Sequence, residues 1–225
     1  MIWILALIVV LGVIVGPSYW VSRVLKHHSG EREDYPGTGG DMAEHLIDKL
    51  GLEGVQIEES PGGDHYDPSS KTVRLTKDKL EGRSLTAVVV AAHEVGHALQ
   101  DQRGEASFKL RSGLAVFSYM LQKIAPAALI AVPLLAVWNP AISRWALIAA
   151  IGSMLISTLV SLATLPVEWD ASFGKALPIL QSGGYLSDED IQNARHILLA
   201  AAMTYVAASL ISLLNAGAWL RVLRR

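Results

Sequence analysis

The sequence predicts a mainly α integral membrane protein with about four transmembrane helices and a small α+β domain. Two observations lead to this fold class. Apolar residues make up 51% of the 225 residues and gather in four long runs. Charged residues gather between these runs, where short alternating patterns predict strands and apolar residues at helical spacing predict helices.

The first apolar run covers residues 1–22 and is predicted to be a transmembrane helix. It is just long enough to cross a hydrocarbon core of about 30 Å. A cleaved signal peptide would have basic residues before the run and a small-residue cleavage site after it. The run has neither, and Arg23 and Lys26 follow it, so we expect the helix to be retained.

Residues 30–112 are predicted to form the small polar domain. Residues 41–50 have the apolar spacing of a short helix that ends at Gly51. Residues 55–58 and 72–76 alternate like strands, so we expect a β-hairpin. This hairpin has two interpretations: an edge strand that binds an extended peptide through its backbone, or a plain cover for the next helix.

The most informative pattern is H-E-x-x-H at residues 93–97. On a helix His93 and His97 lie one turn apart on the same face, so both imidazoles can bind one metal ion. Glu94 lies about 100° further round, from where its carboxylate can act on water at the metal. This arrangement indicates a zinc hydrolase with one Zn²⁺ per chain and Glu94 as its general base.

A chance occurrence of this pattern is the alternative. The local sequence argues against it, because Ser84 is a predicted N-cap and Gly104 a predicted stop for an apolar helix. A candidate third ligand also lies downstream.

The remaining apolar runs complete the predicted membrane part. Residues 114–137 and 144–165 are predicted to form a transmembrane hairpin, and residues 197–220 the last span. Small residues in the last run suit close helix packing in lipid. Ser187 is the predicted N-cap of the helix that leads into it, and we interpret the acidic residues 188–190 as its first turn rather than a metal site.

The third metal ligand is expected in the segment 166–195. A catalytic zinc needs three protein ligands and one open position. With four spans, the loops after the first and third spans lie on the same side of the membrane, which brings Glu168 and Asp170 to the side of the histidine pair. We favour Glu168 as the ligand. Asp170 is the alternative, either as a ligand or as an acceptor of a hydrogen bond from a ligand histidine.

His65 and Tyr66 are candidates for a further catalytic role. His65 is a candidate donor to the transition-state oxyanion, with Tyr66 as a second candidate, and a plain turn residue is the alternative for His65. The other histidines are interpreted as interfacial or partly exposed: His27, His28, His45 and His196.

Composition and charge exclude several classes of protein. The chain has no cysteine, which excludes thiolate zinc sites, disulfides and thiol catalysis. Its net charge of −2 gives no sign of nucleic-acid binding. The expected partners are a peptide or membrane-protein substrate and the lipid bilayer.

The distribution of basic residues predicts the orientation in the cell membrane. Eight flank the spans on the catalytic side: Arg23, Lys26, Arg32, Arg103, Lys109, Arg111, Lys175 and Arg195. Four lie on the other side: Arg144, Arg221, Arg224 and Arg225. This bias favours a cytoplasmic catalytic domain, although the basic C-terminus disagrees unless the last helix lies along the surface.

Five segments together resemble the small bacterial membrane-bound neutral zinc metallopeptidases of the YugP type. They are HYDP at 65–68, VRL at 73–75, AAHEVGHA at 91–98, LPVEWDAS at 165–172 and AAMTYVAA at 201–208. The resemblance covers most of residues 38–214 and implies a zinc-dependent membrane peptidase.

The layout is also distantly similar to the HtpX-like and CAAX prenyl proteases. This similarity implies metal ligation by His93, His97 and Glu168 and a catalytic base at Glu94, as in a gluzincin. Those proteases have an aspartate four residues after the ligand glutamate, where this chain has Ser172.

We therefore predict a membrane-bound zinc metalloendopeptidase that acts in membrane-protein or unfolded-protein turnover. One alternative is a site-2-type intramembrane protease, but the polar residues 100–103 directly after His97 argue against a membrane span there. The other is a non-catalytic membrane metal-binding or scaffold protein, against which Glu94 argues because a structural site needs no base.

Overall fold

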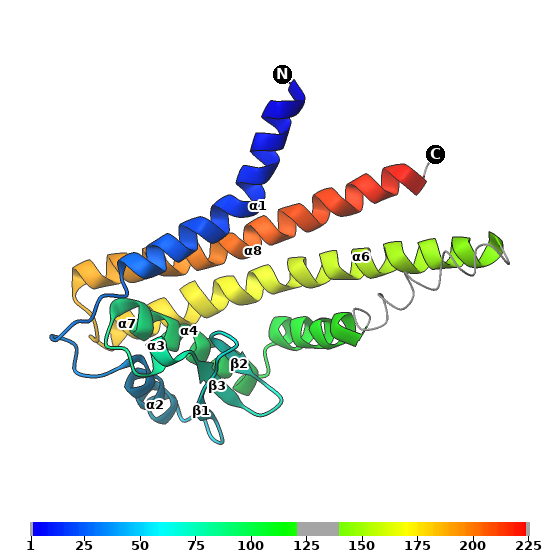
Figure 1. Ribbon diagram of the computed structural model, residues 1–225. Coiled ribbons are helices and arrows are strands. Elements are labelled where there is room, and N and C mark those ends of the chain that lie inside the picture. Colours follow the sequence, from blue (N-terminus) through cyan, green and yellow to red (C-terminus); the bar gives the residue numbers. More distant parts are fainter. Residues whose placement is uncertain (1, 121–139, 224–225) are drawn as a thin grey trace. The chain divides into compact units, whose positions relative to one another are not determined.

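The computed structural model describes residues 2–120 and 140–223, which belong to two compact units (Figure 1). One unit comprises Met1–Glu105 and Val167–Thr204, and the other Ala106–Pro166 and Tyr205–Arg225. The main helices are α1 (Ile2–His27), α2 (Gly39–Leu50), α3 (Lys77–Leu80), α4 (Leu85–Gln102), α6 (Pro140–Trp169), η1 (Asp170–Ala176), α7 (Leu177–Ser182) and α8 (Asp188–Leu223). A further helix covers residues 106–120. The predicted span at 114–137 lies largely outside the described residues.

A three-stranded sheet lies in the first unit, in the order β1–β3–β2. Its strands are β1 (Gln56–Glu59), β2 (His65–Asp67) and β3 (Thr72–Leu75). The central strand β3 is parallel to β1 and antiparallel to β2. Val73 and Leu75 of β3 are fully buried, and β2 and β3 both contact α4. The sheet therefore covers one side of the helix that carries the H-E-x-x-H pattern.

The predicted hairpin between residues 55–58 and 72–76 is wrong. These two strands are parallel neighbours, and the hairpin partner of β3 is β2, which the sequence pattern did not predict. Because β2 has only three residues and a single apolar side chain, Tyr66, its alternation is too short to recognise.

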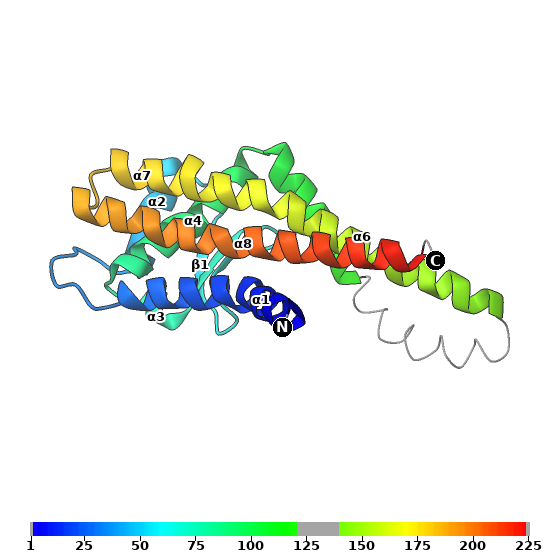
Figure 2. The same ribbon diagram turned by 90° about the horizontal axis from the view of Figure 1, so that it is seen from above.

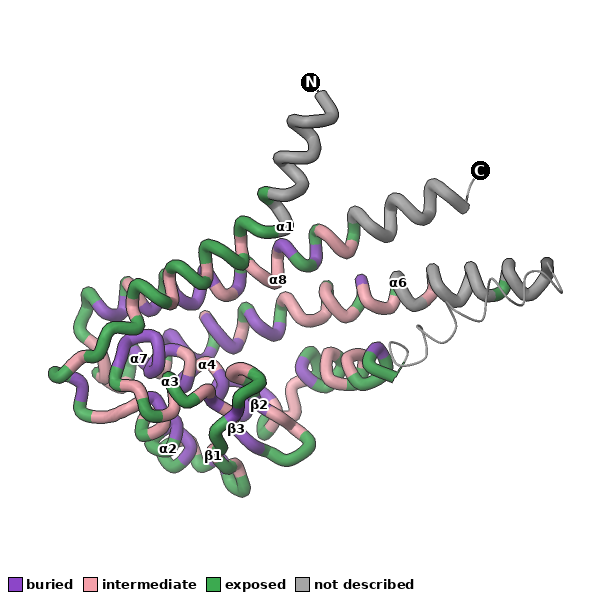
Figure 3. The backbone as a smooth tube through the Cα atoms, viewed as in Figure 1, coloured by how far each residue is buried: buried purple, intermediate pink, exposed green. Residues whose placement is uncertain are grey.

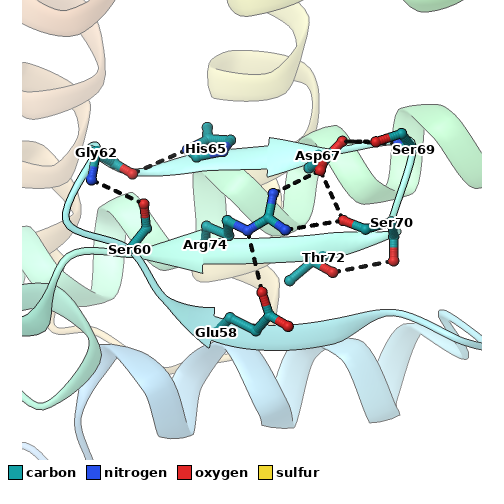
Figure 4. A network of polar contacts seen from close by, with 10 residues as sticks. Glu58, Ser60, Gly62, His65, Asp67, Ser69, Ser70, Thr72 and Arg74 are labelled. Carbon is teal, nitrogen blue, oxygen red and sulfur yellow. Dashed lines mark hydrogen bonds and ion pairs between the residues drawn. The ribbon is translucent and has the colours of Figure 1, made fainter.

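Arg74 of β3 links all three strands on one face of the sheet (Figure 4). Its guanidinium donates to Asp67 of β2 at 2.7 Å and to Glu58 of β1 at 3.3 Å. Asp67 also accepts hydrogen bonds from Ser69 and Ser70 in the turn that follows. These bonds, with those of Ser69 and then Arg74 the strongest, hold the pKa of the Asp67 carboxyl well below its ordinary value.

Capping residues set the limits of α2 and α4. The Ser84 hydroxyl accepts from the Ala87 N–H, which confirms the predicted N-cap of α4. Thr38 and Asp41 form a capping box, so α2 begins at Gly39, two residues before its predicted start. A Cβ at Gly39 would lie 2.7 Å from the Ala87 carbonyl oxygen, so a glycine is required where α2 approaches α4.

The ends of α1 and α8 are attached to the same unit by polar contacts. Thr86, in the first turn of α4, donates its hydroxyl to the Leu25 carbonyl at 2.8 Å and its N–H to the His28 carbonyl at 3.2 Å. At the start of α8, the Ser187 hydroxyl accepts from the Asp190 N–H, as predicted, and the Asp190 carboxylate accepts from Arg32. The HExxH helix is therefore held at its N-terminus by the end of α1.

In the second unit, α6 and α8 run alongside each other in both ribbon views (Figures 1 and 2). Hydroxyl groups connect them: Ser209 donates to the Ser161 carbonyl at 3.0 Å, and Thr158 donates to the Ser212 carbonyl at 3.2 Å. Such hydroxyl contacts and small residues are typical of helices that pack in lipid.

The mainly helical fold with a small sheet is confirmed, but the prediction of four spans is not. Among the residues that the structure describes, one segment, Asp188–Leu213, is long and apolar enough to cross a membrane. Long helices do cover the first and third apolar runs, as α1 and α6. Buried residues concentrate in α4, β3 and η1, whereas the described side chains of α1 are mostly exposed (Figure 3).

We expect Asp67→Asn to destabilise the protein near neutral pH, by roughly 1–2 kcal/mol, because it weakens charge-assisted hydrogen bonds. The folded pKa of Asp67 lies below its unfolded value, so this stabilisation is complete above about pH 4. It is lost as the pH falls through the folded pKa. Thermal unfolding of both proteins between neutral and acidic pH should show the difference shrinking on acidification.

Glu58→Gln is the matched control, because Glu58 contacts the same guanidinium but has half its side chain exposed. Exposed ion pairs contribute little, so its unfolding midpoint should stay close to that of the wild type. A difference between Asp67→Asn and wild type that is independent of pH would contradict the assigned role of the Asp67 charge.

Candidate metal centre

The two histidines of α4 face the end of α6 and the beginning of η1. Their rings lie 4.8 Å apart, one helical turn from each other. His97 is buried and His93 is partly exposed, so one side of the pair remains open to solvent. This is the geometry that the spacing of the sequence predicts.

Glu168, near the C-terminal end of α6, completes a group of three ligand atoms. Its Oε2 lies 3.2 Å from Nε2 of His93 and 3.3 Å from Nε2 of His97. The three atoms lie within 4.8 Å of one another. Burial opposes ionisation of Glu168, but the two histidines outweigh it and keep the pKa of this carboxyl well below its ordinary value.

This donor set fits a zinc ion. Zinc binds histidine nitrogen and carboxylate oxygen at about 2.0–2.1 Å, so two ligand atoms of a tetrahedral site are separated by roughly 3.3 Å. The separations of the Glu168 oxygen from the two nitrogens match this value. The set holds three protein ligands, which is the number that leaves a fourth position open for catalysis.

Gly96 allows α4 to approach η1 closely. A Cβ at this position would lie 3.0 Å from the Ala171 carbonyl oxygen and 3.3 Å from Cβ of Lys175. Even an alanine would require these neighbours to shift by a few tenths of an ångström. The glycine inside the H-E-x-x-H pattern therefore permits the close approach of the π-helix that follows Glu168.

The chain from Asp170 to Ala176 is a π-helix that begins two residues after Glu168. Its wider turn is seen in the hydrogen bond from the Leu177 N–H to the Ser172 carbonyl, five residues earlier. Pro178 follows, and a proline has no N–H to continue regular α-helical bonding. The sequence pattern does not predict this widening.

Gln100 connects His97 to the π-helix. Its amide oxygen lies 3.0 Å from Nδ1 of His97, and its amide nitrogen donates to the Val167 carbonyl at 3.0 Å and to Asp170 at 2.8 Å. Lys175 in turn donates to Asp170 at 2.7 Å. Asp170 thus contacts a ligand histidine only through Gln100, and it is not among the three grouped ligand atoms.

Ser172 supports the other histidine. Its hydroxyl oxygen lies 3.2 Å from Nδ1 of His93. Ser172 is four residues after Glu168, the position at which the HtpX-like and CAAX prenyl proteases have an aspartate. Each ligand histidine therefore has a neutral hydrogen-bond partner behind it.

Glu94 lies beside this centre and is buried, with 6% of its surface exposed. Burial raises its pKa to about 7, and the nearby charges of Glu168 and Asp64 add to this rise. The charge of His93 and the Tyr66 backbone oppose it. A carboxyl that titrates near neutral pH can both accept and return a proton.

The structure does not bring His65 into the metal centre. Its side chain is exposed, its Nδ1 contacts the Gly63 carbonyl at 3.1 Å, and it is paired with Arg74 in the sheet (Figure 4). The Tyr66 hydroxyl donates to Asp101 at 2.9 Å. A role for either residue at the oxyanion stays a prediction.

Sequence reasoning missed Gln100 and Lys175. Gln100 follows His97 by three residues, so the helical period alone would have placed it next to that histidine. Lys175 follows Asp170 by five residues, and this spacing brings side chains together only in a π-helix, which the sequence does not predict.

Comparison with known proteins agrees with the site. A family model described as "Putative neutral zinc metallopeptidase" matches residues 2–224. The chain is 35% identical over 207 residues to the "Putative membrane protease YugP" of Bacillus subtilis (strain 168), and the match covers 88% of each chain. No solved structure matches the chain.

We expect the purified protein to contain about one zinc per chain and Glu168→Ala to lose it, because this change removes one of three ligands. Asp170→Ala should retain zinc, since Asp170 lies behind Gln100 rather than on the metal. Metal analysis of the three proteins after dialysis measures this. Zinc lost from Asp170→Ala but kept by Glu168→Ala would identify Asp170 as the ligand instead.

Proposed function

We propose that this chain, which belongs to the neutral zinc metallopeptidase family, is a membrane-bound zinc metalloendopeptidase of the gluzincin type. The observation that carries the proposal is that the candidate ligand atoms of His93, His97 and Glu168 lie within 4.8 Å of one another. Glu94 is buried beside them. A peptide or membrane-protein segment is the proposed substrate, in membrane-protein or unfolded-protein turnover.

The proposed mechanism assigns each step to a residue of the chain. When bound, zinc acts as a Lewis acid toward water and the peptide carbonyl. Glu94 takes the proton of the attacking water and then delivers it to the leaving amine nitrogen. Its burial and its pKa near 7 suit both halves of this transfer.

The edge strand β2 is the proposed binding site for an extended substrate. It is one of the two outer strands of the sheet, it contacts α4, and the Tyr66 backbone lies next to Glu94. A peptide could add to this edge through backbone hydrogen bonds. We also propose His65, at the beginning of β2, as the oxyanion donor.

The exposed side chains of the long helices support a membrane location. Large apolar residues are about 40–70% exposed along the described parts of these helices: Val15, Tyr19 and Trp20 of α1, Trp145, Leu155, Leu159 and Leu162 of α6, and Leu210 and Leu213 of α8. Such surfaces are unfavourable in water and are typical of lipid-facing helices. We propose a multi-pass protein of the cell membrane with its catalytic domain in the cytoplasm.

A non-catalytic metal-binding or scaffold protein is the second candidate. A structural zinc site is closed by four protein ligands, whereas the group found among the described residues 2–120 and 140–223 has three. A buried glutamate beside the ligands has no use in such a site. Both observations favour the peptidase.

We expect Glu94→Gln to bind zinc like the wild type and to lose at least about 10²-fold in the rate of peptide hydrolysis, because the amide cannot accept the proton. The measurement is cleavage of an unfolded model protein, with zinc content determined in parallel. Glu81→Gln, an exposed change on the same domain, is the control and should cleave normally. A fully active Glu94→Gln would exclude the mechanism.

We also expect the variants Ser29→Cys and Ser182→Cys to expose their thiols on the same side of the membrane. The thiol of Ser143→Cys should lie on the opposite side. The chain has no native cysteine, so each introduced thiol is labelled without background. An impermeant maleimide applied to intact cells should label only position 143. The reverse pattern would overturn the orientation, and equal labelling of all three would overturn the four-span arrangement.

A further inference from the structure

We propose that Gln100 is a positioning residue of the metal centre, whose side-chain amide fixes the tautomer and the ring orientation of His97. The proposal rests on the zinc-dependent function proposed above. It concerns a residue outside the ligand set, and it explains how a histidine is prepared for metal binding by an amide, rather than a carboxylate, at its Nδ1 atom.

The contacts of Gln100 leave its amide no freedom. The residue is fully buried, and its amide group bonds His97, Asp170 and the Val167 carbonyl at once. Val167 directly precedes the ligand Glu168, so one side chain joins the two ends of the centre. A buried amide with three partners is held in one position, because loss of any bond would leave a polar group unpaired.

The partners also fix which end of the amide faces the histidine. The Val167 carbonyl can only accept a hydrogen bond, so the amide nitrogen must point toward it. The amide oxygen therefore points toward Nδ1 of His97. Because this oxygen can only accept, Nδ1 must carry a proton, and the lone pair of the neutral ring is left on Nε2. Nε2 is the atom that faces Glu168 and the metal position.

The charges of Asp170 and Lys175 strengthen this orientation of the Gln100 amide. Asp170 accepts from the same amide nitrogen, and Lys175 donates to Asp170 at 2.7 Å and to Glu105 at 3.0 Å. The Lys175 side chain is 10% exposed and the Asp170 side chain is 40% exposed, so the contact between them is only partly shielded from solvent. The positive charge holds the Asp170 carboxylate as an acceptor, and the carboxylate in turn holds the amide nitrogen toward it.

His93 provides a contrast within the same centre. Its partner behind the ring is the Ser172 hydroxyl at 3.2 Å, and a hydroxyl can either donate or accept. The tautomer of His93 is therefore not fixed by its partner. The two ligands differ, and the control exerted by Gln100 applies to His97.

The test measures zinc affinity by competition with a chelator, independently of activity. Gln100→Leu removes both the acceptor and the donor at similar volume, and we expect zinc binding to weaken roughly 10- to 100-fold, the usual effect of losing a hydrogen-bond partner of a ligand histidine. Gln102→Leu is the matched control. Gln102 lies on the same helix but donates to the Gly51 carbonyl, so its loss should leave zinc affinity unchanged.

A second variant pair tests polarity rather than packing. Gln100→Glu should weaken zinc binding. Its second carboxylate oxygen would replace the amide nitrogen and face the Asp170 carboxylate and the Val167 carbonyl, which can only accept hydrogen bonds and would repel it. The added change Asp170→Asn supplies an N–H donor to that oxygen, and we expect it to recover at least part of the lost affinity. A residue that only fills space would show no such recovery, since all these side chains have similar volumes.

A third measurement uses the wild-type protein without metal and so does not depend on any variant folding. Nitrogen NMR of the histidine rings should show a proton on Nδ1 of His97, where the Gln100 oxygen accepts it, whether or not Nε2 also donates to Glu168. An Nδ1 of His97 that carries no proton would overturn the proposal.

The outcomes separate this proposal from the proposed function. Wild-type protein that binds no zinc would overturn the peptidase assignment itself. Wild-type protein that binds zinc, together with a folded Gln100→Leu of unchanged zinc affinity, would overturn only the role of Gln100.

Discussion

The proposed metal centre depends on the close contact between α4 and η1. Its three candidate ligands come from two segments about 70 residues apart in the sequence, and they meet where Gly96 lets the Ala171 backbone approach the helix. Histidines on one helix can be spaced by local geometry alone, but the third ligand requires this tertiary contact. The Ser84 cap, the attachment of α4 to the end of α1 and the cover provided by the sheet all hold α4 in the position that the contact needs.

Burial determines how the polar groups of the centre are arranged. Glu168 is 2% exposed and Gln100 is fully buried, so each of their polar atoms must find a partner inside the protein. The partners form a continuous series from the ligands through Gln100 and Asp170 to Lys175. A buried carboxylate between two imidazoles is stabilised by positive charge, and a divalent cation at this point supplies it without protonating the ligands.

The sequence predicted the parts of this structure that follow from local periodicity. The H-E-x-x-H helix with its cap, the last helix beginning after Ser187 and the choice of Glu168 depended on helical spacing, capping chemistry and chain order. The sheet was mispredicted because β2 is too short to show a period and its pairing is set by tertiary contacts. The link from Asp170 to Lys175 was missed because it is made across a π-helix, which local periodicity does not predict.

The position of the aspartate differs between this chain and the proteases that its layout resembles. In the proteases that the layout resembles, an aspartate lies four residues after the ligand glutamate; here that place is taken by Ser172, whose hydroxyl contacts His93 directly. The aspartate lies two residues earlier, and the amide of Gln100 connects it to His97. The Gln100 amide is oriented by the Asp170 carboxylate and presents its oxygen to His97, but it brings no negative charge to the ring. If Gln100 has the proposed role, the histidines are oriented with no carboxylate behind either ring, which would leave more positive charge on a bound zinc and favour a stronger Lewis acid at the expense of metal affinity.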